Sequence, residues 1–190
     1  MREVHLYSMS TGVYEGSGKC LPINYGMVNI PYGEIFIAET SGRVVHLSLT
    51  DDFDNELKRF KSRWYLSSTS HQPDQCQRLA DSIFAEDTEY AQARLLLMGN
   101  DLQCAVWSEV ARIPKGSVAS YSDIAERIGK PDSARFVANI VVDNPVAYLV
   151  PCHRVVRHNG TLGSYRWGQE SKRKLLKAEG CTPSHLDIAV

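Results

Sequence analysis

The spacing of hydrophobic and polar positions changes near residue 100, and the first half predicts a small sheet with helices. Three short runs rich in β-branched residues, separated by turn residues, lie at 26–30, 34–40 and 43–49. Such runs are typical of an antiparallel meander. Helical spacing follows at 51–63 and 73–84, with a polar loop at 67–72, and we expect this helix pair to cover one face of the sheet. Residues 1–22 show no usable pattern.

The second half predicts short helices with compact links. Apolar side chains share one helical face over 102–113. Ser120 and Asp123 have the spacing of a capping box, which predicts a helix over 120–128, and a further helix is expected over 132–142. Two short helices joined by a tight turn resemble a helix-turn-helix, whose second helix often lies against DNA. Plain helix packing is the alternative.

The change of pattern predicts an α/β protein of two small domains. We expect an N-terminal domain of antiparallel sheet with helices over residues 23–98. A C-terminal domain over 99–180 is expected to be a winged-helix or helix-turn-helix-like α domain with short strands. Residues 1–22 are set apart as an extension of unknown role, and 181–190 as a tail.

Composition and charge exclude several classes of protein. Of the 190 residues 43% are hydrophobic and 23% charged, which excludes disorder and collagen. There is no uncharged apolar run of about 18 residues, and the first ten residues lack the core of a signal peptide. We therefore expect no membrane partner and a cytoplasmic location, or a nuclear one if the source is eukaryotic. Residues 1–100 carry 9 basic and 13 acidic side chains, and residues 101–190 carry 12 and 9. Only the second half has the net positive charge that attracts a polyanion.

The cysteines favour neither a disulfide framework nor a metal site. Their number is odd and no pair has the spacing of zinc ligands; they are Cys20, Cys76, Cys104, Cys152 and Cys181. We expect no cofactor and no metal. The alternative is a zinc site assembled from distant residues such as His5, Cys20, His46 and Cys76.

One segment carries candidate chemistry, the run from Pro151 to Val156 that follows an apolar strand expected at 146–150. Cys152 is a nucleophile only as the thiolate, and His153 is the obvious base. Neighbours on an extended strand point to opposite faces, so their contact requires a turn or a bridging water. Glu179, at the end of a helix expected over 171–179, is a candidate to orient the imidazole. The alternative is a buried structural cysteine beside a solvated histidine.

The second half resembles the O6-alkylguanine-DNA alkyltransferase family in the order and spacing of several motifs. They are Val106-Trp107, Ile113-Pro114, Ser120-Tyr121, Ala134-Arg135-Phe136-Val137-Ala138, Asn144-Pro145-Val146, Pro151-Cys152-His153-Arg154-Val155-Val156, Tyr165-Arg166-Trp167-Gly168 and Leu175-Leu176. Residues 24–49 resemble the opening strands of the amino-terminal domain in bacterial members, including members fused to an adaptive-response activator.

The resemblance implies a single-turnover repair reaction on double-stranded DNA that contains alkylated guanine. The damaged base is swung out of the duplex, and its alkyl group passes irreversibly to Cys152. O6-methylguanine is the expected lesion, with O4-methylthymine as a further one. The resemblance implies a metal-free and cofactor-free site, and we expect the protein to act as a monomer.

The same resemblance implies a role for individual residues. Glu179 orients His153, which draws the thiol proton through a water, and Asn144 holds the pocket wall by hydrogen bonds. Tyr121 donates a hydrogen bond to the base ring, and Lys172 lies near the cysteine end of the pocket. The residues implied to line the pocket are Val155, Tyr165 and Arg166.

For DNA, the resemblance implies that Arg135 fills the gap left by the flipped base. The residues implied to touch the DNA backbone are Ser122, Lys130 and His158, each with a solvated side chain as the alternative. The chain departs from the family pattern at Phe136 and Ile140, where alanine is common, and at Asp143, which would repel phosphate if exposed.

Two other functions fit parts of the pattern. The first is a non-catalytic module that binds alkylated lesions or regulates an adaptive response, against which the presence of Cys152 argues. The second is a Cys-His hydrolase, which needs an oxyanion hole and repeated turnover, and the sequence shows no sign of either.

Overall fold

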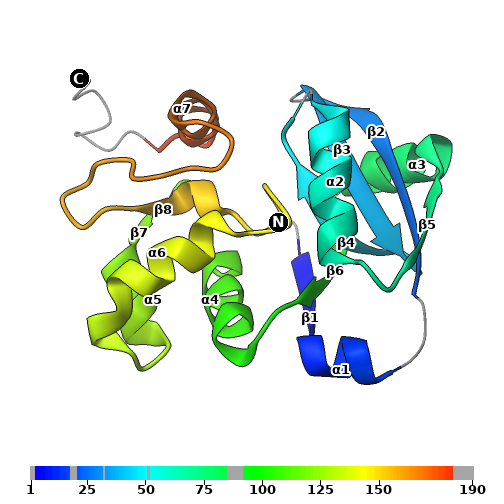
Figure 1. Ribbon diagram of the computed structural model, residues 1–190. Coiled ribbons are helices and arrows are strands. Elements are labelled where there is room, and N and C mark those ends of the chain that lie inside the picture. The colour runs from blue at the N-terminus through cyan, green and yellow to red at the C-terminus, as the bar shows by residue number, and fades with distance from the viewer. Residues whose placement is uncertain (1–2, 18–20, 32, 51, 85–91, 182–190) are drawn as a thin grey trace. The chain divides into compact units, whose positions relative to one another are not determined.

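The computed structural model describes residues 3–17, 21–31, 33–50, 52–84 and 92–181. The chain divides into two compact units (Figure 1). The first comprises residues 1–100 and 145–147, and the second comprises residues 101–144 and 148–190. The predicted α/β class is confirmed.

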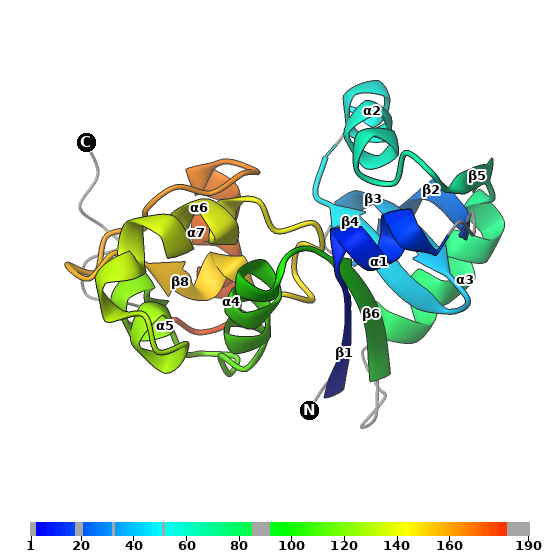
Figure 2. The ribbon, with the colours of Figure 1, turned by 60° about the horizontal axis from the view of Figure 1, so that its bottom comes forward.

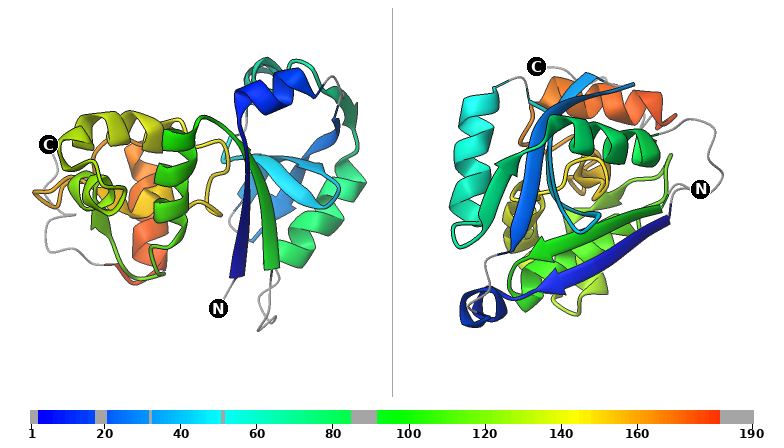
Figure 3. Two further views of the ribbon diagram at one scale, coloured as in Figure 1. Left: turned by 90° about the horizontal axis from the view of Figure 1, so that it is seen from below. Right: turned by 90° about the vertical axis from the view of Figure 1, so that its right-hand side faces the viewer.

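The first unit is built on a six-stranded sheet with the strand order β1-β6-β4-β3-β2-β5. The strands are β1 (Glu3–Met9), β2 (Pro22–Ile30), β3 (Gly33–Thr40), β4 (Arg43–Ser48), β5 (Ser68–His71) and β6 (Gln92–Met98). The predicted antiparallel meander is β2, β3 and β4. The whole sheet is mixed, which corrects the expectation of an antiparallel sheet: β6 pairs in parallel with β1 and β4, and β5 pairs in parallel with β2 (Figure 3).

The two edge strands are elements that the sequence pattern does not reveal. β1 and α1 (Thr11–Gly16) lie in the stretch 1–22 that the pattern sets apart as an extension, yet β1 pairs with β6 along its whole length. β5 consists of Ser68, Thr69, Ser70 and His71, within the expected polar loop. Edge strands have one unpaired side and often carry polar residues that discourage further pairing, so their hydrophobic alternation is weak.

Two helices of the first unit lie where the sequence predicts them but on opposite faces of the sheet (Figure 2). They are α2 (Phe53–Arg63) and α3 (Pro73–Phe84). Phe60 of α2 shares a hydrophobic cluster with Tyr25 of β2. The next strand residue, Gly26, points the other way, and a Cβ atom there would lie 2.7 Å from the Cα of Pro73. The expected helix pair on one face is therefore wrong, and Gly26 is required because α3 begins against it.

Residues 145–147 join the first unit through a single bridge to β4. The amide of Leu47 donates to the carbonyl of Pro145 at 2.9 Å, and the amide of Ala147 donates to the carbonyl of Leu47 at 2.8 Å. Turns follow up to residue 149, so the prediction of a strand over 146–150 is wrong. The apolar character of this run reflects burial, not regular pairing.

The second unit consists of short helices around a two-stranded sheet. Its elements are α4 (Asp101–Ala111), β7 (Ala119–Ser120), α5 (Tyr121–Arg127), the 3-10 helix η1 (Pro131–Ser133), α6 (Ala134–Val142), the 3-10 helix η2 (Cys152–Arg154), β8 (Val155–Val156) and α7 (Gln169–Ala178). β7 and β8 pair in parallel. Among the described residues, no helix has both the length and the apolar character needed to cross a bilayer.

Local contacts confirm the predicted start of α5 and fix α4 against α6. The Ser120 hydroxyl accepts from the amide of Asp123 at 3.1 Å, and the Asp123 carboxylate accepts from the amide of Ser120 at 2.7 Å. This reciprocal pair is a capping box. Trp107, fully buried in α4, donates its indole N–H to the carbonyl of Ile140 at 3.0 Å. The helix-turn-helix pair α5 and α6 is thereby held on the core of the second unit.

Candidate active site

Cys152 is the first residue of η2, and this short helix changes the geometry expected from the sequence. The amide of Arg154 donates to the carbonyl of Pro151 at 2.9 Å, which closes the turn. Cys152 and His153 therefore follow a helical turn instead of an extended strand. Cys152 is 3% exposed and His153 is fully buried. The thiol and the imidazole both lie inside the second unit.

Asn144 holds the sulfur of Cys152 directly. Its Nδ2 donates to Sγ of Cys152 at 3.1 Å and to the carbonyl of Val150 at 2.8 Å. Asn144 follows Asp143, the C-cap residue after α6, and the Asn144 side chain is fully buried. One amide group thus connects the end of α6 to the segment that carries the thiol, and it places an N–H donor where a thiolate would be stabilised.

His153 and Glu179 meet as the sequence predicts. Nε2 of His153 lies 3.1 Å from Oε1 of Glu179, the C-cap residue after α7. Arg154 also holds this carboxylate, donating from Nε to Oε2 at 2.8 Å and from Nη2 to Oε1 at 2.7 Å. Although burial opposes ionisation, the hydrogen bonds from Arg154 and His153 lower the pKa of Glu179 to about 2. Glu179 is therefore an anion that fixes the orientation of the imidazole.

The resting site holds its proton on sulfur. Burial raises the pKa of the Cys152 thiol to about 11, against the opposing effects of the Asn144 hydrogen bond and the positive charges of Lys172 and Arg166. Burial also lowers the pKa of His153, an effect that Glu179 opposes. With Nε2 donating to Glu179, the remaining nitrogen, Nδ1, is an acceptor. Nδ1 is buried and has no hydrogen-bond partner among the described residues.

Lys172 is a buried cation that the chain holds by backbone oxygens. Its ammonium donates to the carbonyl of Val155 at 2.5 Å and to the carbonyl of Leu162. It lies 5.8 Å from the centre of the Tyr165 ring. Burial lowers the pKa of Lys172 to about 8, while the nearby Cys152 opposes that change. The expected neighbourhood of Lys172, Val155, Tyr165 and Cys152 is therefore formed within the second unit.

Two buried hydroxyl groups have no hydrogen-bond partner among the described residues, those of Tyr121 and Tyr165. Burial raises the pKa of both, so each stays protonated and able to donate. The backbone of Gly163 lies against Tyr121, because a Cβ on that glycine would be 2.8 Å from the Tyr121 hydroxyl. Buried donors without partners are rare in folded proteins. They identify a place where a polar ligand can complete the bonding.

Arg166 contacts the same region from the loop before α7. Its Nη1 donates to the carbonyl of Asn144 at 3.3 Å, and its guanidinium lies 5.2 Å from the centre of the Trp167 ring. Val155 is fully buried in β8. The structure thus brings the predicted catalytic and pocket residues together, while the sites expected to touch DNA lie elsewhere on the unit.

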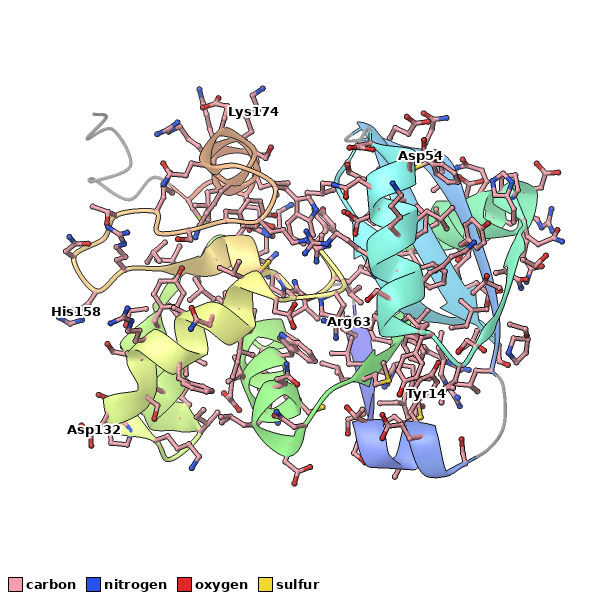
Figure 4. The ribbon with its side chains drawn as sticks, viewed as in Figure 1. Tyr14, Asp54, Arg63, Asp132, His158 and Lys174 are labelled. Carbon is pink, nitrogen blue, oxygen red and sulfur yellow. The ribbon has the colours of Figure 1, made fainter. Side chains whose placement is uncertain are left out.

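The residues expected to contact DNA are at the surface or near it. Arg135 is exposed in the first turn of α6, Lys130 is exposed in the link between α5 and α6, and Ser122 is half-buried in the first turn of α5. His158 is exposed in the loop that follows β8, where its side chain points away from the fold (Figure 4). The prediction for these four residues is contact with DNA, which does not require them to lie next to the thiol.

The three departures from the family pattern have different positions. Phe136 is 62% exposed beside Arg135, whereas Ile140 is buried in the core. Asp143 is half-buried at the end of α6. Relative to the alanine that is common at both positions, Ile140 therefore changes the packing of the core, whereas Phe136 changes the surface.

Two residues of the site, Arg154 and Tyr148, were not among the residues predicted from the sequence. Arg154 lies inside the motif at residues 151–156. A partly buried arginine requires an acidic partner, and this is the sequence signal that could have linked Arg154 to Glu179. Tyr148 stacks on His153, with ring centres 6.2 Å apart and an angle of 21° between the planes. Its backbone is left-handed, with φ of 66°. No sequence signal predicts this, because tyrosine seldom adopts that conformation.

A zinc site from distant residues receives no support from the part of the chain that the structure describes. Within those residues there is no group of three or more His, Cys, Asp or Glu side chains that could hold a metal ion. Nε2 of His46 lies 2.7 Å from a carboxylate oxygen of Glu56. Cys20 lies outside the described residues.

Comparisons with known proteins define the class to which this fold and site belong. Residues 101–181 match the family model described as 6-O-methylguanine DNA methyltransferase, DNA binding domain. Over 176 residues the chain is 34% identical to the regulatory protein Ada of Salmonella typhimurium, which covers 90% of this chain and 49% of that protein. A methylated-DNA–protein-cysteine methyltransferase of Methanosarcina acetivorans is 37% identical over 106 residues, covering 56% of this chain and 68% of that protein.

A solved structure agrees. OGT of Mycobacterium tuberculosis in complex with DNA has a TM-score of 0.65 and 29% sequence identity, over 84% of this chain and 93% of that chain. The chain belongs to the family of methylated-DNA–protein-cysteine methyltransferases, the O6-alkylguanine-DNA alkyltransferases, as its motifs predict. It spans about half the length of the first curated relatives that it matches.

Proposed function

We propose that this protein repairs alkylated DNA by transferring the alkyl group of O6-alkylguanine to its own Cys152. The observation that carries the proposal is the buried Cys152 thiol with the Asn144 amide 3.1 Å from its sulfur, in the same turn as His153. A thiolate is a soft nucleophile suited to an alkyl carbon, and the thioether that it forms is not reversed by water. Each molecule would therefore act once.

The proton moves first. The S–H bond of Cys152 breaks, and the proton passes to Nδ1 of His153 through a bridging water, while Nε2 remains bonded to Glu179. The carboxylate stabilises the imidazolium, and the Asn144 amide stabilises the thiolate. An electron pair of the thiolate sulfur then forms the S–C bond as the C–O bond breaks. The electrons of the C–O bond pass to the guanine. The proton taken from sulfur ends on the guanine ring, so the products are an alkylated cysteine and neutral guanine.

The departure of guanine requires donors that face the base. The buried hydroxyls of Tyr121 and Tyr165, which have no partner among the described residues, are suited to donate to the ring as negative charge develops. The charge of Lys172 acts in the same direction, since it favours the thiolate and the anionic base alike. Val155 and Arg166 complete the pocket in this proposal.

The burial of Cys152 implies how DNA must bind. A base stacked in a duplex cannot reach a thiol that is 3% exposed, so the base has to leave the stack. Arg135, exposed on α6, is suited to fill the resulting gap, and Lys130, Ser122 and His158 are suited to contact phosphates. The net positive charge of the second half supports this partner. O4-methylthymine is a further lesion that this pocket would accept.

We further propose that the protein acts as a monomer. The reaction requires a reduced thiol and access to chromosomal DNA, so we place it in the cytoplasm, or in the nucleus if the source is eukaryotic. Both statements are separate from the chemistry at Cys152 and are tested by the mass of the protein in solution and by its location in cells.

A turnover experiment tests the proposed reaction. The protein is mixed with an excess of duplex that carries radiolabelled O6-methylguanine, beside a Cys152→Ser variant as the control. We expect label to accumulate on the protein and stop at one methyl group per molecule, with none on the variant. Binding of the duplex without loss of methyl would favour a lesion-binding module instead. Continued turnover with label released to solvent would favour a hydrolase.

A further inference from the structure

Tyr148 lies in the turn at residues 147–149 and has a left-handed backbone, which is unusual for a tyrosine. Among the described residues, Ser41 and Tyr148 are the non-glycine residues with positive φ, at 50° and 66°. Ser41 stands with Gly42 in the two-residue turn between β3 and β4, where left-handed residues are usual. Tyr148 stands in no hairpin, and a left-handed conformation is unfavourable for a bulky side chain. Strain of this kind tends to persist where a functional arrangement depends on it.

The strained backbone places the Tyr148 ring on His153. The ring centres are 6.2 Å apart and the planes make an angle of 21°, which is an offset stack. His153 is fully buried, and Tyr148 is half-buried. Nε2 of the same imidazole meets Glu179, so the imidazole is held at its edge by the carboxylate and on its face by the phenol ring.

The groups around His153 have opposing effects on its protonation, so a ring stacked on the imidazole can shift the balance between its neutral and charged forms. Glu179 favours a positive charge on the imidazole, whereas burial and the cations of Arg154 and Lys172 disfavour it. Cys152 is the neighbour whose proton the imidazole must accept. The face of an aromatic ring carries partial negative charge and attracts a cation that lies over it. The centres of the Tyr148 and His153 rings are 6.2 Å apart, close to the outer limit of this attraction, so the phenol ring adds a small preference for the imidazolium over the neutral imidazole.

We propose that Tyr148 is a positioning residue of the alkyl-transfer site: its ring, carried by a left-handed backbone, holds the imidazole of His153 against Glu179 and stabilises the imidazolium that forms when His153 takes the thiol proton. The proposal rests on the alkyl transfer proposed above. It adds a residue that acts on the reaction through His153.

Two substitutions separate the ring from the backbone. Tyr148→Gly removes the ring and relieves the strain, because glycine adopts a positive φ without cost, so the variant is expected to fold. Tyr148→Phe keeps the ring and removes the hydroxyl. Ser41→Gly is the matched control, since it relieves the other left-handed residue at a turn of the first unit. The rate of alkyl transfer from a free O6-alkylguanine base to Cys152 is measured from about pH 4 to pH 9 for each protein, so that the range includes the protonation of His153.

For Tyr148→Gly we expect a rate about fivefold lower near neutral pH, with the acid limb of the profile displaced to lower pH by about 0.7 unit, because loss of the ring makes His153 a weaker base that becomes protonated by solvent only at lower pH. Tyr148→Phe and Ser41→Gly should match the wild-type profile. A Tyr148→Gly profile equal to wild type overturns the proposal, and so does an equal loss at every pH, which would mark simple packing. A Tyr148→Phe profile that matches Tyr148→Gly instead of wild type also overturns the proposal, because it assigns the effect to the hydroxyl and not to the ring. A wild-type protein that accepts no alkyl group would instead refute the proposed function.

Discussion

Replacement of Glu179 by glutamine tests the electrostatic core of the site. The substitution keeps the shape of the side chain but removes the charge that accepts from His153 at 3.1 Å and from two nitrogens of Arg154 at 2.8 and 2.7 Å. The Glu179 side chain is 6% exposed and that of Arg154 is 15% exposed, so water screens the lost charge poorly. After the change, the guanidinium of Arg154 keeps its bond to the carbonyl of Ile113 but has lost its counter-ion.

The pKa of Glu179 sets the magnitude of the loss and its dependence on pH. Its ordinary value is 4.5 and the structure lowers it to about 2, so at about 1.4 kcal/mol per pKa unit the charge contributes at most about 3.5 kcal/mol to folding. Glutamine can still accept one bond from Arg154, and we expect Glu179→Gln to lower the free energy of unfolding by about 2 kcal/mol at neutral pH. Because the folded-state pKa is depressed, this contribution is complete above the unfolded value of 4.5 and is lost as the pH falls toward 2.

Urea unfolding at pH 7, 5, 4 and 3 measures this difference between wild type and Glu179→Gln. We expect it to be constant from pH 7 to about pH 5 and to fall below half of its neutral value by about pH 3. Glu170→Gln is the control in the same helix, because Glu170 pairs with Arg173 at the surface with a side chain that is 65% exposed, and such pairs contribute little. The reasoning is refuted if Glu179→Gln costs no more than Glu170→Gln at pH 7, or if its cost is the same at every pH.

Three further substitutions address DNA and the pocket. Arg135→Ala should spare transfer from a free alkylated base and slow repair of duplex DNA by tenfold or more; equal losses on both substrates would make Arg135 structural. Phe136→Ala removes a ring that is 62% exposed, so it should leave the free energy of unfolding within about 0.5 kcal/mol yet weaken duplex binding in a fluorescence titration; unchanged binding would place the ring off the DNA. Gly163→Ala should lower the free energy of unfolding by about 1–3 kcal/mol because of the backbone φ of 69°. It should lower it further because the new Cβ would lie 2.8 Å from the Tyr121 hydroxyl. Gly129→Ala is the control for the backbone cost alone, because Gly129 has φ of 71° and nothing lies within 4 Å of its Cβ position. Equal losses of stability in the two variants would exclude a contribution from the Tyr121 hydroxyl.

The sequence predicted the parts of the fold whose stability is local. The helices α3 and α5 and the meander of β2, β3 and β4 lie where hydrophobic period, capping residues and turn residues place them. The edge strands β1 and β5 were not predicted, because polar residues are common in edge strands and weaken the hydrophobic alternation. The apolar run at 146–150 misled for a different reason: it is buried by contacts distant in sequence, and burial alone does not distinguish a strand from a turn.

The sequence predicted one contact of the candidate site, between His153 and Glu179, but not the backbone turn at Cys152. Motif order placed Cys152, His153 and Glu179 in one set, and the structure brings His153 and Glu179 into contact. The helical turn at Cys152 was not predictable from the residue types, and it decides which way the thiol and imidazole point. Tyr148 was out of reach of sequence reasoning, because its role depends on a backbone conformation that tyrosine rarely adopts.

In the proposed reaction, the sulfur of Cys152 is the atom that accepts the alkyl group from damaged DNA. The protein is incubated with an equimolar duplex that contains O6-methylguanine, digested, and its peptides are weighed by mass spectrometry. The account predicts that the peptide with Cys152 gains the mass of one methyl group, while those with the buried Cys76, whose burial raises its thiol pKa to about 12, and Cys181 stay unmodified. An unmodified Cys152 peptide beside a duplex that still carries its lesion would contradict the account.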